Sequence, residues 1–261
     1  MNILTYAPYL LAATFIVFST PSVLHAQIFS LPDRIRDAKL SSLSIEALQV
    51  DQDINKVRPS LLGSAFFVKK SDVAYAITNA HVVAALRKNQ QLLVGANLKR
   101  GKAYLEAELV KADHTIDVAV LKLGKTLFNS GEEIEFDQAF VGVSLFSPDS
   151  LIQEGVQVLV IGYPLNIGVE SLGNQPVSRV GIVAQSTGPF GTFLIDGIVS
   201  HGNSGSPVFK AETLQLLGMI ISFMGDKIDF VDETGALLAR LPHNSGLSLC
   251  ISANKILALI P

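Results

Sequence analysis

Three polar residues have the side-chain types that activate an oxygen nucleophile. His81 closes one apolar run, Asp117 opens another, and Ser204 lies between two glycines. A serine hydroxyl is a weak nucleophile at neutral pH and needs a neighbouring base, which a histidine can supply. A carboxylate behind the histidine fixes its tautomer and stabilises its charged form. Together the three residues predict hydrolysis of an acyl group, provided that the fold brings them into contact.

The glycines next to Ser204 indicate a strained turn. Gly202 and Gly205 permit backbone conformations that other residues rarely adopt, and such a turn pushes the serine out of the packing. A plain tight corner would also use glycine, and an aspartate at the start of a strand is usually a turn residue. A tight corner would not require His81 and Asp117 upstream at the ends of apolar runs, so the nucleophile interpretation is favoured.

The order His81, Asp117, Ser204 is one of several unrelated orders in which such triads occur. It differs from the order in α/β-hydrolases, and the last glycine of their Gly-x-Ser-x-Gly motif is replaced here by serine. An apolar strand follows the serine instead of a helix, which also weakens that alternative. His114 and Asp113 are less favoured substitutes for the base and its carboxylate.

Short apolar runs separated by turn residues recur in two sets of six, which predicts an all-β fold of two six-stranded antiparallel barrels. The first set comprises 44–50, 63–69, 73–79, 91–95, 103–112 and 117–123, and the second comprises 156–162, 177–185, 192–196, 207–210, 215–223 and 246–251. A short C-terminal helix with Ser252 as its N-cap is expected. Residues 224–245 are interpreted as a long connection with a helical piece around 235–241.

The N-terminal residues predict export. Residues 1–26 contain no Lys, Arg, Asp or Glu, and their apolar stretch is about ten residues, against roughly 20 for a membrane span. A signal peptide cleaved near Ala26, and a periplasmic or secreted mature chain without a stable membrane span, are expected. An uncleaved anchor is the alternative. The remaining boundaries expected are an extension over 27–43, a first barrel over 44–140, a connector over 141–155 and a second barrel over 156–261.

Composition excludes several classes. Hydrophobic residues make up 49% of the chain and charged residues 16%, with a net charge of -3, so neither disorder nor a nucleic-acid-binding face is expected. The single cysteine, Cys250, cannot form an intrachain disulfide and is expected to be buried and inert.

Seven segments resemble, in order, blocks of the trypsin-like serine proteases, and of their HtrA (Deg) branch in particular. The three segments around the triad are TNAHVV (78–83), DVAVLKL (117–123) and GNSGSPVF (202–209), and the others are GSAFFV (63–68), VLVIGYPLNIG (158–168), VGIVAQ (180–185) and GLSLCIS (246–252). There is also some similarity to the glutamyl endopeptidases. No segment resembles the PDZ domains typical of the HtrA branch, so a member without one is expected.

The resemblance implies a serine endopeptidase with His81, Asp117 and Ser204 in a site between the two barrels. It places the oxyanion hole at the backbone N–H groups of Gly202 and Ser204. It implies protein or peptide substrates and no metal or organic cofactor. A homotrimer formed through residues 27–43 is also expected from the HtrA branch.

Specificity is expected to follow from the strand after the nucleophile. The resemblance assigns Ile221, Ser222 and Phe223 to the wall of the first specificity pocket. Glutamyl endopeptidases carry a histidine in that strand, and none occurs here. Cleavage after small or medium apolar residues is therefore expected. His201 is interpreted as a solvent-facing loop residue, and Asp196 as a turn residue or a brace for the nucleophile turn.

Two alternatives remain open. A catalytically silent or latent binding module, chaperone-like and on the same fold, would keep the triad residues without turnover. A non-peptidase acyl hydrolase would use the same triad on esters.

Overall fold

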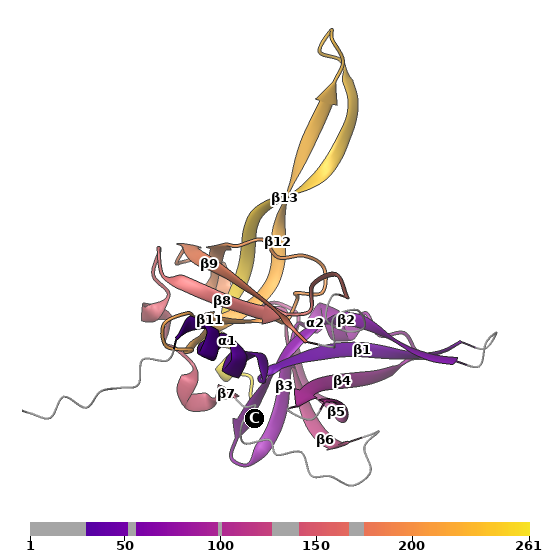
Figure 1. Ribbon diagram of the computed structural model, residues 1–261, viewed down its shortest axis with the longest axis vertical. Helices are drawn as coiled ribbons and strands as arrows, with labels where there is room; N and C mark the ends of the chain where they lie inside the picture. The colour runs from indigo at the N-terminus through magenta and orange to yellow at the C-terminus, as the bar shows by residue number, and fades with distance from the viewer. Residues whose placement is uncertain (1–29, 52–55, 99–100, 127–140, 167–174) are drawn as a thin grey trace, which may run out of the picture.

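Strands dominate the part of the chain that the structure describes. The structure is a computed structural model, and it describes residues 30–51, 56–98, 101–126, 141–166 and 175–261. The expected signal peptide lies outside these residues. Within them, the two closed barrels and the short C-terminal helix that the sequence predicts are confirmed (Figure 1).

The first barrel closes in the strand order β1-β4-β5-β6-β3-β2, because β1 also pairs with β2. All of these pairings are antiparallel, and short β7 (Val141–Gly142) joins β2 in parallel. Alternating side chains fill its interior, with Leu43, Phe67 and Leu121 fully buried. The strands are β1 (Ser42–Asp51), β2 (Lys56–Lys70), β3 (Val73–Thr78), β4 (Gln91–Leu98), β5 (Gly101–Asp113) and β6 (Val118–Thr126).

The second barrel closes in the order β10-β13-β12-β11-β8-β9. Its interior holds Phe193, Ile220 and Cys250, all fully buried. Burial raises the pKa of the Cys250 thiol well above its ordinary value, so the thiol stays protonated as the sequence predicts. The strands are β8 (Gln157–Gly162), β9 (Val177–Gln185), β10 (Thr192–Asp196), β11 (Pro207–Lys210), β12 (Leu216–Val231) and β13 (Leu237–Ser252).

A third apolar cluster joins the two barrels. Phe66 and Ile77 of the first barrel pack with Leu159 and Met219 of the second, all of them fully buried. Burial of this many apolar side chains between the barrels fixes how the two sit on each other. The functional groups on the two barrels are therefore held in a constant relative position.

Two helices cover the junction between the barrels. In α1 (Leu31–Lys39), Ala38 is buried in the shared cluster, and Arg34 donates a hydrogen bond of 2.8 Å to the Glu212 carbonyl. In α3 (Ala253–Leu257), Ser252 is the N-cap residue, as predicted, although its side chain makes no capping hydrogen bond. No helix within the described residues is long and apolar enough to cross a membrane.

The helical piece expected around residues 235–241 is wrong. β12 and β13 run beyond the barrel as a hairpin whose strands pair from Gly225 and Asn244 outward, and 237–241 is strand (Figure 1). The run of Ala and Leu at 236–239 favours helix in isolation. Cross-strand contacts outweigh that preference, because Ile228 lies directly opposite Leu241.

We predict that Phe67→Ala lowers the free energy of unfolding by about 3–5 kcal/mol, because it leaves a cavity in the first barrel. Leu238→Ala is the control, since Leu238 is 68% exposed and its replacement should change the free energy by about 0.5 kcal/mol or less. Urea titrations followed by circular dichroism measure both. Equal effects of the two substitutions would contradict the described core.

Candidate active site

His81 and Asp117 form a close pair on the first barrel. His81 Nδ1 lies 2.6 Å from Asp117 Oδ2, and the His81 backbone N–H donates a hydrogen bond of 2.9 Å to Oδ1 of the same carboxylate. His81 belongs to the short helix α2 (Ala80–Ala84) after β3, and Asp117 directly precedes β6. These strands pair with each other, which brings the two residues together.

The backbone conformation of Asp117 is unusual. Its φ is +54°, in the left-handed region, which aspartate tolerates better than most residues. The Asn79 side chain donates a hydrogen bond of 2.9 Å to the Asp117 carbonyl. Asn79, which is buried, therefore holds the turn that aims the carboxylate at His81.

Two turns of the same kind share Asn203, and Ser204 is the second residue of the later turn. The Asn203 N–H donates to the Ser200 carbonyl at 3.0 Å, and the Ser206 N–H donates to the Asn203 carbonyl at 2.9 Å. The third residue of each turn is a glycine with positive φ, +92° at Gly202 and +88° at Gly205, as type II turns require. The tight-corner and nucleophile interpretations of the glycines therefore coincide here.

Neither glycine tolerates a side chain. A Cβ on Gly202 would overlap the Tyr163 carbonyl oxygen, and a Cβ on Gly205 would overlap the Ser64 carbonyl oxygen. Both glycines are required by the close approach of another backbone segment as well as by their positive φ.

Ser64, in β2, is a hydrogen-bonding centre that the sequence analysis did not identify. Its N–H donates to the Ser204 carbonyl at 2.8 Å, and its hydroxyl donates to the Gly202 carbonyl at 2.7 Å. The same hydroxyl accepts from the Tyr163 N–H at 2.9 Å. One buried side chain of the first barrel thus holds the nucleophile turn of the second.

The orientation of the Gly202 amide is fixed from the neighbouring carbonyl. The His201 carbonyl accepts a hydrogen bond of 2.7 Å from the Leu165 N–H. A trans peptide directs its C=O and N–H to opposite sides, so the Gly202 N–H points away from Leu165. Within the described part of the chain, neither the Gly202 nor the Ser204 N–H has an acceptor, so both can donate to a ligand.

Tyr163 is packed behind this turn. Its phenol is fully buried, and burial, together with the nearby charge of Glu46, raises the pKa of Tyr163 well above its ordinary range. The phenol therefore stays neutral. Glu46 is itself fully buried on β1 and accepts hydrogen bonds from Ser44 and Tyr104.

The Ser204 hydroxyl opens into a hollow of about 310 Å³ that His81 also lines. Among the described residues its one hydrogen bond is a long one, 3.4 Å, donated to the Ile221 carbonyl, and none joins it to His81. A serine hydroxyl turns freely about χ1, and such hydrogen bonds are often long before a substrate binds. The structure brings Ser204 and His81 to one hollow without a hydrogen bond between them.

The three residues expected in the specificity wall, Ile221, Ser222 and Phe223, all line this hollow. His201 also lines it, and its ring meets Phe223 edge to face at a centroid distance of 5.6 Å. His201 is exposed, as predicted, but it is also part of the hollow. Among the described residues that line the hollow, the two histidines are the only titratable ones.

The less favoured residues lie elsewhere. Asp113 accepts hydrogen bonds from the backbone N–H groups of Thr115 and Ile116, so it stabilises its own turn. His114 is exposed and does not line the hollow. Asp196 lies on β10, and its side chain makes no hydrogen bond to the described residues of the nucleophile turn.

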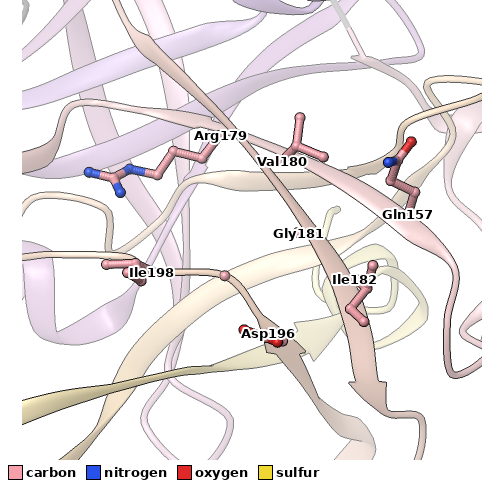
Figure 2. Close-up of a pocket in the computed structure, with 8 residues that line it drawn as sticks. Gln157, Arg179, Val180, Gly181, Ile182, Asp196 and Ile198 are labelled. Atoms are coloured by element: carbon pink, nitrogen blue, oxygen red, sulfur yellow. The ribbon is translucent and has the colours of Figure 1, made fainter.

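Asp196 instead lines a larger, more open hollow of about 600 Å³ on the outside of the second barrel. Figure 2 shows its lining residues on β8, β9, the end of β10 and the segment that follows it. None of these eight residues is a serine, threonine, cysteine or histidine, so the described lining of this hollow offers no side chain suited to nucleophilic attack. Side chains of these types line the smaller hollow, where Ser204 and His81 lie.

Two antiparallel barrels, with a His–Asp pair on one and a serine on a glycine turn of the other, define the class of trypsin-like serine proteases. A family model described as a trypsin-like peptidase domain matches residues 63–219, more than half of the chain. The chain belongs to this family, which confirms the class inferred from the sequence.

Relatives confirm the HtrA branch. The chain is 30% identical over 162 residues to a probable periplasmic serine endoprotease DegP-like from Brucella suis, which covers 58% of this chain and 26% of the relative. It is 26% identical over 242 residues to the serine endoprotease DegS of Haemophilus influenzae, covering 86% and 63%. The chain thus spans about a quarter of the length of the DegP-like relative.

Solved structures share the fold. The MamO protease domain from Magnetospirillum magneticum in its apo form matches with a TM-score of 0.57 at 17% identity, covering 86% of this chain and 97% of that one. The HtrA-type protease AlgW with a decapeptide matches with a TM-score of 0.60 at 19% identity, covering 88% and 66%.

We predict that Ser64→Ala lowers kcat about tenfold to a hundredfold with little change in KM, because a displaced turn loses transition-state contacts. Ser42→Ala is the matched control: Ser42 is also buried and bonds across the barrel interface to the Ile161 carbonyl, but it does not touch the nucleophile turn. Steady-state kinetics on a chromogenic peptide, with melting temperatures alongside, measure both. Equal losses of kcat would contradict a role specific to Ser64.

Proposed function

We propose that this protein is a serine endopeptidase in which Ser204 is the nucleophile, His81 the general base and Asp117 the group that orients it. The observation that supports this best is the pairing of His81 with Asp117 at 2.6 Å beside the hollow that holds Ser204. The two free amides at Gly202 and Ser204 complete the arrangement. The family membership is consistent with it.

In the acylation step, Ser204 Oγ attacks the substrate carbonyl carbon while His81 Nε2 takes the hydroxyl proton. The carbonyl oxygen becomes an oxyanion, to which the N–H groups of Gly202 and Ser204 donate. The C–N bond then breaks, and the leaving amine takes the proton from His81. Asp117 stabilises the imidazolium between these two proton transfers.

Deacylation repeats the same sequence with water. His81 removes a proton from the water, whose oxygen attacks the acyl carbon of the Ser204 ester. The ester C–O bond breaks, Oγ recovers the proton from His81, and the free carboxylic acid departs. No group other than the three side chains and the two amides is needed.

The hollow next to Ser204 favours apolar side chains. Val199, Ile220 and Phe223 line it, and no lysine, arginine, aspartate or glutamate in the described part of the chain does. A charged substrate side chain would lose its hydration there without gaining a partner of opposite charge. We therefore propose cleavage after small or medium apolar residues of proteins or peptides. The names of the relatives suggest a periplasmic or other extracytoplasmic location.

One observation favours a second candidate, a latent or silent module. The Ser204 hydroxyl donates to the Ile221 carbonyl and not to His81. If that hydrogen bond persisted with substrate present, the base would not activate the nucleophile. The protein would then bind polypeptides without cleaving them.

We predict that Ser204→Ala and His81→Ala each lower turnover by a factor on the order of 10⁴ to 10⁶, because the triad acts as a unit. Both variants should stay folded, since Ser204 Oγ makes one weak hydrogen bond and His81 is half exposed. Release of peptides from an unfolded protein substrate, read by mass spectrometry, measures turnover. Peptide release by Ser204→Ala at the wild-type rate would contradict the mechanism.

For specificity, we predict a cleavage-site profile dominated by Ala, Val and similar side chains, with Glu, Asp, Lys and Arg depleted. The apolar lining near Phe223 is the reason. Digestion of a proteome-derived peptide library, with sequencing of the new ends, gives the profile. Dominance of Glu, Lys or Arg before the cut would contradict the prediction.

A further inference from the structure

β12 and β13 continue past the second barrel as a two-stranded arm, defined here as residues 224–244. Among the described residues, these strands pair only with each other from Gly225 and Asn244 to Val231 and Leu237. Figure 1 shows the arm standing clear of both barrels. An isolated two-stranded hairpin is marginally stable in water and gains stability from a third strand.

The two faces of the arm differ in chemistry. On one face Ile228 lies opposite Leu241 and Phe230 lies opposite Ala239. On the other face Arg240 donates two hydrogen bonds to the Asp229 carboxylate, at 2.5 and 2.7 Å. Seven large apolar side chains of the arm are between 44% and 68% exposed: Met224, Ile228, Phe230, Val231, Leu237, Leu238 and Leu241. Exposed apolar groups in such number on one element are typical of a binding surface.

One edge of the arm is continuous with the hollow. β12 passes Ser204 at Ile221, forms the wall of the hollow as far as Phe223, and then becomes the outer strand of the arm. Its barrel neighbour β11 pairs with it only up to Met219. From Ile221 to Val231 no described strand pairs with that edge, which spans about 11 residues or roughly 36 Å.

The chemistry of the site sets which part of a substrate meets this edge. The leaving amine must lie beside His81, which protonates it, and His81 belongs to the first barrel. The acyl part then lies on the second barrel, next to β12. The substrate residues upstream of the cut therefore extend from Ser204 toward the arm tip. Their N-to-C direction points back toward Ser204 and is antiparallel to β12.

We propose that the free edge of β12 along the arm, from Met224 to Val231, binds the polypeptide upstream of the cleaved bond as an added antiparallel strand. Main-chain hydrogen bonds would supply affinity, and alternate side chains would extend the apolar face at Ile228 and Phe230. The ligand is an extended segment with alternating apolar residues, which a folded substrate does not present. The proposal rests on the proposed function only for the direction of the segment.

Charge favours this occupant over an anionic membrane. The arm carries Asp226, Asp229, Asp232 and Glu233 against Lys227 and Arg240, a net negative charge. That charge repels an anionic lipid surface and attracts a segment with basic side chains at its polar positions. The other possible occupant, the arm of a second copy of the chain, is distinguished below by light scattering.

The first experiment measures binding without cleavage, in the Ser204→Ala protein. The probe is a fluorescent peptide of about 12 residues in which valine alternates with lysine or threonine, followed by anisotropy. The comparison protein has residues 226–243 replaced by Asn-Gly, a turn that joins the paired residues Gly225 and Asn244. We expect the shortened arm to weaken binding about tenfold or more.

Two further peptides test strand addition itself. One carries backbone N-methyl groups at its odd positions and the other at its even positions, which removes alternate N–H donors and leaves the side-chain sequence unchanged. In an added strand only one set of donors faces β12, so one peptide should lose arm-dependent binding and the other should keep it. Equal binding of both peptides would overturn the proposal.

Cleavage by the wild-type protein gives the functional readout. We compare kcat/KM for a peptide with about 12 residues upstream of the cut with kcat/KM for a peptide that has only the last four of these residues. The ratio should be about tenfold or more in the wild type, and near one with the shortened arm. A ratio near one in the wild type overturns the proposal. It is also overturned if shortening the arm changes the oligomeric state in light scattering but leaves peptide binding and this ratio unchanged. If neither the 12-residue nor the four-residue substrate is cleaved while arm-dependent binding is intact, the peptidase function is overturned and the arm proposal stands.

Discussion

The position of Ser204 depends on two backbone hydrogen bonds that hold the peptide group between Ser204 and Gly205 from opposite barrels. The Ser64 N–H of the first barrel donates to the Ser204 carbonyl, and the Gly205 N–H donates to the Ile220 carbonyl of the second. The conformation that satisfies both has positive φ at the glycines on either side. The nucleophile is therefore fixed by the junction between the barrels and not by its own loop alone.

This arrangement divides the chemistry between two rigid bodies. The first barrel carries His81 and Asp117, the proposed base and its carboxylate, and the second carries Ser204 and the two free amides. The shared apolar cluster, which includes Phe66, Leu159 and Met219, holds the two halves in a fixed relative position. Ser64 and Leu165 then set the orientation of the turn through backbone groups. An account of activity that considers only the triad would omit these contacts.

The sequence predicts much of this, for reasons that can be named. Alternating apolar runs give the twelve barrel strands, and the types and order of His81, Asp117 and Ser204 give the candidate triad. The roles of Ser64 and Leu165 could not be predicted, because one is a buried serine in an apolar strand and the other acts only through its backbone N–H. The arm was mistaken for a connection because helix propensity near Leu237 hid pairing with a strand that precedes it. Backbone contacts between segments distant in sequence leave little signal in residue types.

The proposed mechanism requires His81 and the amides of Gly202 and Ser204 to be arranged around the Ser204 hydroxyl before a substrate binds. Labelling of the protein with a fluorophosphonate probe, read by intact mass and peptide mapping, tests it most directly, because the probe phosphonylates only an activated serine. We predict a single label, on Ser204, and its loss in the His81→Ala protein. A folded protein that takes up no label, or takes it up equally without His81, would contradict the account.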